Sequence, residues 1–103
     1  MSKELRTKAM DRLLDAIRSM KDDDELYAFL QDLCTISELE AFAQRFEVAE
    51  ELHNRRTYQE IVKTTGASTA TISRVNRALN YGEDGYVLAI RRLAQKEDIK
   101  SEQ

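Results

Sequence analysis

Proline is absent from the 103 residues of this chain, and glycine occurs only three times. Because these two residues break helices most strongly, only the glycines and polar capping residues can end a helix here. Apolar residues recur along the chain at three- and four-residue spacings, as they do on one face of an α-helix. The sequence therefore predicts an all-α fold of about six helices.

Capping residues place the ends of these helices. The second to fifth expected helices begin at an acidic or hydroxyl N-cap, two of them with a Ser/Thr-x-x-Glu capping box, and two helices end at glycine. The predicted helices are Lys3–Lys21; a second from the aspartates of Lys21–Glu25 to about Cys34; a third from a Ser37–Glu40 capping box to about His53; a short fourth opened by Thr57 and Glu60 and stopped by Gly66; Thr69–Tyr81, capped by Ser68; and Asp84–Lys96. Residues 1–97 are expected to form one domain and residues 98–103 a frayed tail.

The apolar faces of these helices define an expected core. A chain of this length buries only a modest share of its surface, so a second copy would help to stabilise it. Dimerisation is therefore expected. The residues predicted to face inward outside the fourth and fifth helices are Met10, Leu13, Leu14, Ile17, Met20, Leu26, Phe29, Leu30, Leu33, Leu39, Phe42, Phe46, Ala49, Leu52, Tyr86, Leu88, Ile90, Leu93 and Ala94.

The segment TGASTATISRVNRAL (Thr65–Leu79) has one glycine between two helical runs and many polar residues on the second run. Two helices joined by a short turn that contains glycine are typical of a helix-turn-helix. We predict this motif over residues 57–81. The residues expected to seal it are Ile61, Val62, Thr65, Ala67, Ile72 and Val75.

The second helix of this motif has an outward face suited to DNA. Short hydroxyl side chains let a helix backbone approach base edges in the major groove, and arginine reaches guanine or phosphate oxygens. A helical hairpin with a merely solvated polar face is the alternative, although glutamate and lysine would be commoner there. The outward and flanking residues are Thr69, Ala70, Thr71, Ser73, Arg74, Asn76 and Arg77.

The charges are distributed unevenly. The net charge of −3 and isoelectric point near 5.2 do not show the basic character of many DNA-binding proteins. However, residues 22–51 contain ten acids and only Arg45 as a base, whereas residues 52–82 contain five bases and only Glu60 as an acid. The motif would therefore offer phosphates a basic surface, while the acidic segment would disfavour other docking orientations.

The sequence contains no metal-ligand cluster, phosphate-binding glycine loop or catalytic pair, so we expect neither an enzyme nor a bound metal or cofactor. Cys34 is expected to be a small buried side chain, and His53, the only histidine, has no evident partner for catalysis. A lone cysteine, with no signal peptide and no long apolar run, indicates a cytoplasmic protein that does not enter a membrane.

Several motifs combine in the centre of the chain. A threonine precedes a capped scaffold helix that has an arginine midway and Glu-Glu-Leu at its end, and a later helix carries GA-x-x-ATI-[ST]-R. These pieces lie in LCTISELEAFAQRFEVAEEL (Leu33–Leu52) and TYQEIVKTTGASTATISRVNRAL (Thr57–Leu79). This combination resembles the Trp repressor family. Residues 1–32 and 83–103 resemble the family only in helical pattern.

The resemblance implies an intertwined homodimer that binds a two-fold operator in double-stranded DNA, with each recognition helix in the major groove. It also implies phosphate contacts by Lys63, Arg55 and Arg56. The groove-facing positions would be Thr69, Ala70, Thr71 and Ser73. The protein would then be a transcriptional regulator that acts as a repressor. The alternative is a helix-turn-helix module for protein or RNA interaction.

In the family, two arginines and a threonine hold the corepressor tryptophan. By resemblance Arg45, Arg74 and Thr35 take these places. Val75 and Ala78 depart from the pattern, because tryptophan-binding members have a glycine and a serine there. A branched side chain beside the indole and a lost hydroxyl both oppose binding. We therefore expect that L-tryptophan is not the effector. The alternatives are a smaller or differently shaped effector held by Arg45 and Arg74, or two arginines that simply lie at the surface.

Overall fold

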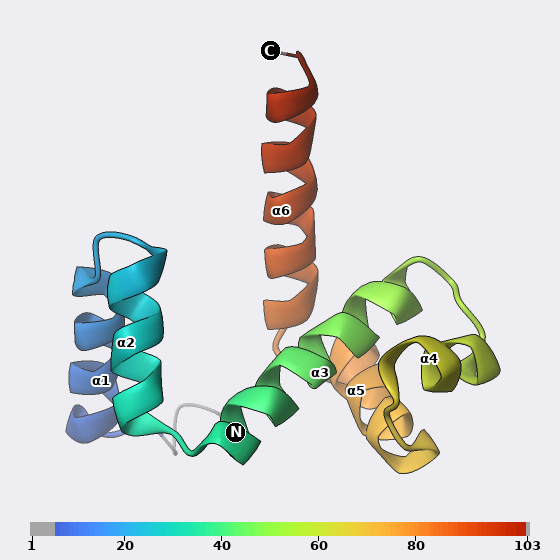
Figure 1. The fold of residues 1–103 in the computed structure, drawn as a ribbon, viewed down its shortest axis with the longest axis horizontal. Coiled ribbons are helices and arrows are strands. Elements are labelled where there is room, and N and C mark those ends of the chain that lie inside the picture. Colours follow the sequence, from blue (N-terminus) through green and yellow to red (C-terminus); the bar gives the residue numbers. More distant parts are fainter. Residues whose placement is uncertain (1–5, 103) are drawn as a thin grey trace. The chain divides into compact units, whose positions relative to one another are not determined.

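A computed structural model describes residues 6–102, with side chains for residues 6–100. This part of the chain forms helices and no strand (Figure 1), which confirms the predicted all-α class. The helices are α1 (Lys8–Ser19), α2 (Asp23–Leu33), α3 (Ile36–His53), α4 (Tyr58–Thr65), α5 (Thr69–Tyr81) and α6 (Gly85–Glu102). Residues 3–5 of the expected Lys3–Lys21 helix lie outside the described range, and Arg6 and Thr7 precede α1 instead of belonging to it.

The helices divide into two compact units, Met1–Leu39 and Glu40–Gln103. The boundary falls within α3. Neither α1 nor α2 contains a buried residue. In the single chain their apolar faces therefore do not form a core.

The first unit is a hairpin of α1 and α2 (Figure 1). The Thr7 hydroxyl accepts the N–H of Met10 at 3.1 Å and so caps α1. Asp22 caps α2 by accepting the N–H of Glu25 at 2.9 Å, as the aspartate run predicted. Several residues predicted to face inward are nevertheless exposed here: Met10, Leu14 and Leu33. The hairpin thus presents an uncovered apolar surface.

The second unit contains the buried core, which joins α3, both helices of the predicted motif and α6. Phe46 and Tyr86 pack against it, with ring centroids 6.4 Å apart. Burial of one valine or isoleucine side chain in this core contributes about 1.5–3 kcal/mol to the free energy of unfolding. The core residues are Val48, Ala49, Ile61, Ala67, Ile72, Val75 and Ile90. Val48 was not predicted, and five residues predicted to face inward are exposed: Phe42, Val62, Leu88, Leu93 and Ala94.

Two predicted helix ends are wrong. The capping box of α3 uses Thr35 and Glu38, not Ser37 and Glu40: the Thr35 hydroxyl accepts the Glu38 N–H at 3.1 Å, and the Thr35 N–H donates to the Glu38 carboxylate at 2.8 Å. The tail expected to fray from residue 98 is helical through Glu102. No proline or glycine follows Gly85, and the lysine, glutamate and glutamine there favour helix.

Candidate nucleic-acid interface

Helices α4 and α5 form the helix-turn-helix predicted over residues 57–81. The Thr57 hydroxyl accepts the Glu60 N–H at 3.2 Å, and the Thr57 N–H donates to the Glu60 carboxylate at 2.8 Å, which lowers the pKa of Glu60. Gly66 ends α4 with a φ of +74°, and Ser68 caps α5, both as predicted. Local capping chemistry therefore fixes both ends of the turn.

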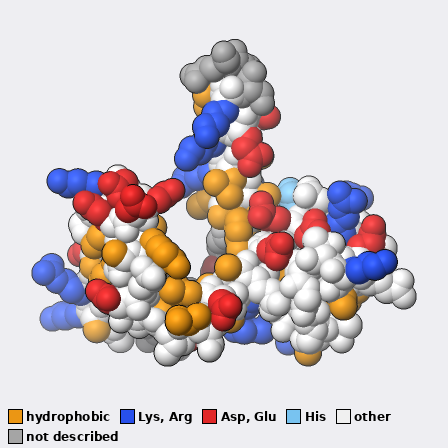
Figure 2. Space-filling view, in the orientation of Figure 1, with side chains coloured by type: hydrophobic (Ala, Val, Ile, Leu, Met, Phe, Trp, Pro, Cys, Tyr) orange, Lys and Arg blue, Asp and Glu red, His pale blue; other side chains and the backbone are white. Residues whose placement is uncertain are grey.

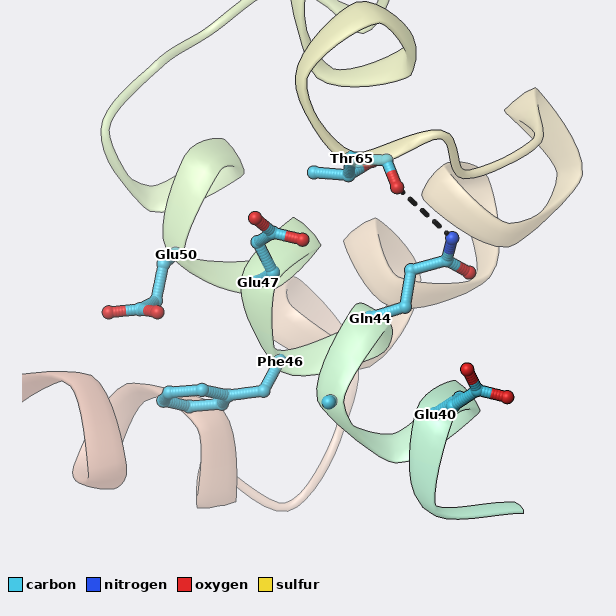
Figure 3. Close-up of a pocket in the computed structure, with 7 residues that line it drawn as sticks. Glu40, Gln44, Phe46, Glu47, Glu50 and Thr65 are labelled. Carbon is cyan, nitrogen blue, oxygen red and sulfur yellow. Dashed lines mark hydrogen bonds between the residues drawn. The ribbon is translucent and has the colours of Figure 1, made fainter. Parts of the chain in front are cut away.

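The turn is also held by Thr65 and by α3. The Thr65 hydroxyl donates to the Ile61 carbonyl at 2.7 Å and accepts the N–H of Ala67 at 3.1 Å. The Thr65 carbonyl accepts a hydrogen bond from the side-chain amide of Gln44 on α3 at 3.2 Å (Figure 3). Sequence reasoning missed Gln44, because one polar residue within a helix is usually solvated. This bond ties α3 to the turn that orients α5.

Helix α5 has a buried side and an exposed side. Ile72 and Val75 are 0% and 1% exposed and belong to the core. The side chains expected to contact DNA are exposed, except for the half-buried Thr71: Thr69, Ala70, Thr71, Ser73, Arg74 and Arg77. The fold therefore directs this polar and basic set away from the core.

Thr71 is more constrained than the other hydroxyl residues of this face. The Ser68 hydroxyl accepts the Thr71 N–H at 3.1 Å and donates to the Thr71 hydroxyl oxygen at 3.1 Å. Thr71 therefore shares its hydroxyl with the cap of α5. The side chains of Thr69 and Ser73 make no hydrogen bond within the described residues, so their hydroxyls remain uncommitted.

The basic residues expected to contact DNA are all exposed. Among them, and within residues 6–100, only Arg56 has an ion-pair partner, with its Nε 3.9 Å from the Glu51 carboxylate. Exposed cations without such partners are available to phosphate oxygens. The basic residues expected to contact DNA are Lys63 on α4, Arg74 and Arg77 on α5, and Arg55 and Arg56 in the turn before α4.

Acidic side chains lie over α3 in the same unit (Figure 2). Glu40, Glu47 and Glu50 line an open hollow of about 530 Å³ together with Phe46 (Figure 3). Negative charge at this surface repels a phosphate backbone. The charge pattern therefore favours approach of DNA to the basic parts of the unit.

The two residues that depart from the family's corepressor pattern differ in burial. Val75 fills the interior of the helix-turn-helix. Ala78 is exposed and lines an open hollow of about 350 Å³ with Glu83, Gly85 and Tyr86. The valine side chain is thus used to seal the motif.

The three residues expected to grip an effector also have different surroundings. Arg45 is half-buried, with its guanidinium carbon 5.0 Å from the centroid of the Phe42 ring, which is a cation–π distance. Arg74 is exposed and makes no ion pair among the described residues. Thr35 belongs to the first unit, where its hydroxyl accepts a hydrogen bond as the cap of α3.

No helix in residues 6–102 is long and apolar enough to cross a bilayer. Among the side chains of residues 6–100, no three of His, Cys, Asp or Glu form a group that could hold a metal ion. Cys34, predicted to be buried, is half-buried.

A capped and sealed helix pair with a polar, basic outer face defines a helix-turn-helix protein. The family model described as "Trp repressor protein" matches residues 8–94 of the chain. The chain therefore belongs to the Trp repressor family, which confirms the resemblance drawn from the sequence. At the level of the family, this membership supports a DNA-binding regulator.

Similar proteins come from several bacteria. The protein YerC of Bacillus subtilis (strain 168) is 51% identical over 98 residues, which cover 95% of this chain and 94% of YerC. A TrpR-like protein from Eubacterium eligens ATCC 27750 is 55% identical, with a TM-score of 0.86 over 89% of this chain and 95% of that structure. A candidate Trp repressor from Staphylococcus aureus is 42% identical, with a TM-score of 0.86 over 89% and 92% of the two chains.

Proposed function

We propose that this protein is a cytoplasmic transcriptional repressor that binds a specific sequence of double-stranded DNA. The observation that carries the proposal is the outer face of α5. The Thr69 and Ser73 hydroxyls and the arginines of this face have no partner among residues 6–100. They project from a helix whose other side contains the buried Ile72 and Val75. Short side chains permit close approach to base edges, and arginines bind guanine or phosphate. Family membership supports the same conclusion.

The repressor acts as an interlocked homodimer on a two-fold operator. The uncovered apolar faces of α1 and α2 support this arrangement, because a second copy would remove them from water. Two recognition helices related by a two-fold axis would read half-sites about 34 Å apart, or one turn of B-DNA.

L-tryptophan is not the effector of this repressor. Burial of Val75 supports this proposal, because the side chain already occupies the interior of the motif and holds α5 in position. Exposure of Arg74 leaves it available to DNA. The helix-turn-helix would therefore be ready to bind DNA without a tryptophan ligand.

Selection of bound fragments from random duplex DNA would test the proposal and give the operator. Ser73→Gln should then change the sequence preference, because it alters a groove-facing side chain. Lys63→Ala should weaken binding to all duplexes and reduce the salt slope by about 0.9, the value for one phosphate contact. Lys96→Ala, on the exposed part of α6, is the matched control and should change neither. If Lys63→Ala changed the preference and Ser73→Gln did not, the docking face would be wrong.

The alternative, a module for protein or RNA interaction, predicts a different result in the same assay. Salt-dependent binding to duplex DNA that is absent with RNA supports the repressor. Equal binding to both, without selection of a common sequence, would favour the alternative.

A further inference from the structure

Arg55 has a backbone conformation that is uncommon for arginine. Its φ is +62°, in the left-handed region that favours glycine. The Arg55 N–H donates to the Leu52 carbonyl at 3.0 Å, and the Arg56 N–H donates to the Glu51 carbonyl at 3.1 Å. These two bonds close the end of α3 as a Schellman motif, whose left-handed position is usually glycine. The backbone alone would therefore favour glycine at residue 55.

The side chain of Arg55 makes no contact in the described part of the fold that would offset the free-energy cost of this backbone conformation. It is exposed and makes no hydrogen bond or ion pair with any residue from 6 to 100. Arg56 differs, because its Nε lies 3.9 Å from the Glu51 carboxylate. The two adjacent arginines thus differ in whether they have an ion-pair partner in the fold, which the sequence alone could not show.

A cation at the C-terminal end of a helix does gain from the helix dipole. However, the adjacent Arg56 supplies a positive charge at the same end of α3, and a left-handed non-glycine residue is disfavoured by a comparable amount. Stabilisation of α3 therefore does not account for arginine at this position.

We propose that Arg55 binds a DNA backbone phosphate and is the principal cation of the turn before α4. Arg55 lies two residues before Thr57, the cap of α4, so a phosphate held there would fix the helix-turn-helix along the duplex. Arginine would then occupy a glycine position because DNA binding requires its charge. This inference rests on the proposed function and deepens it.

The test compares four variants in two assays, affinity for the selected operator at several salt concentrations and thermal unfolding. Arg55→Gln should weaken binding about tenfold and lower the salt slope by about 0.9. Arg55→Gly should weaken binding equally but melt at the same or a higher temperature, because glycine accepts positive φ. Arg56→Gln should weaken binding less, since that arginine is already paired.

Asp84→Gly is the matched control for backbone relief. Asp84 is the other described non-glycine residue with positive φ, at +64°, and it carries no positive charge. Replacement of Asp84 by glycine should relieve the strain of a positive φ in the same way and should not lower the affinity for DNA. A loss of affinity in this variant would show that relief of strain alone weakens binding, and would overturn the role of Arg55.

The remaining outcomes are equally distinct. If Arg55→Gly lowers the melting temperature and Arg55→Gln keeps both affinity and salt slope, Arg55 is a structural cap and the inference is wrong. If Arg56→Gln loses as much affinity as Arg55→Gln or more, Arg55 is not the principal cation. Failure of the unmodified protein to bind any duplex would refute the proposed function itself, whereas normal binding by Arg55→Gln refutes only this inference.

Discussion

Replacement of Val75 by alanine tests whether this residue seals the helix-turn-helix. Val75 is 1% exposed and belongs to the same cluster as Ile61 and Ile72. The change removes two methyl groups, worth about 0.8 kcal/mol each, and leaves a cavity that adds a further penalty. We therefore expect the free energy of unfolding to fall by about 2–3 kcal/mol. This loss is a large part of the 5–15 kcal/mol typical of a small domain.

Chemical denaturation at fixed protein concentration measures the loss, and a thermal melt should show a decrease of about 10–20 °C. Val62→Ala is the matched control, because it deletes the same methyl groups from the first helix of the motif at a residue that is 39% exposed. It should cost less than about 1 kcal/mol. If Val75→Ala lowered the free energy of unfolding no more than Val62→Ala does, Val75 would face an accessible cavity. The argument against a ligand beside Val75 would then fail.

Three further predictions concern assembly, effector and acid stability. The melting temperature should rise with protein concentration, since the proposed homodimer would couple folding to dimerisation; a monomer in sedimentation with a concentration-independent melt would refute the homodimer. Calorimetry with L-tryptophan should show no micromolar binding and no change in operator affinity, so a micromolar complex that tightens DNA binding would contradict our proposal. The hydrogen bond from the Thr57 N–H lowers the pKa of Glu60 below its usual 4.5. The stabilisation that this bond gives is therefore fully present above pH 4.5, and it is lost as the pH falls through the pKa of Glu60 in the folded protein. Glu60→Gln should therefore lower the free energy of unfolding at pH 7. Between pH 7 and pH 3, this variant should lose less stability than the unmodified protein. If the two proteins showed the same pH dependence, the Glu60 carboxylate would not contribute to it.

The parts of the fold that follow from local chemistry could be predicted from the sequence. Thr57, Gly66 and Ser68 each act within one helical turn of their own position, so the sequence placed the helix-turn-helix correctly. The cap of α3 could not be chosen in the same way, because Thr35–Glu38 and Ser37–Glu40 satisfy the same pattern two residues apart.

Tertiary features were less predictable. Apolar spacing marks a face as suited to burial but does not say what covers it, so Met10 and Leu33 were predicted inward and are exposed in the single chain. For the candidate site, residue type and spacing predicted an outward face of α5, and its residues are exposed apart from the half-buried Thr71. The sequence could not show that Gln44 holds the turn or that Arg55 is left-handed, because both depend on contacts formed only in the folded chain.

The position of the core within the chain also has a consequence during synthesis. Among residues 6–100, every core residue lies between Val48 and Ile90, whereas the hairpin that lacks a core ends at Leu33. A ribosome that adds about 5–20 residues per second would therefore release the apolar hairpin several seconds before Ile90 emerges to complete the core. During this interval the nascent chain is open to aggregation or chaperone binding, and the aspartates beside the α1–α2 turn would help to keep it soluble.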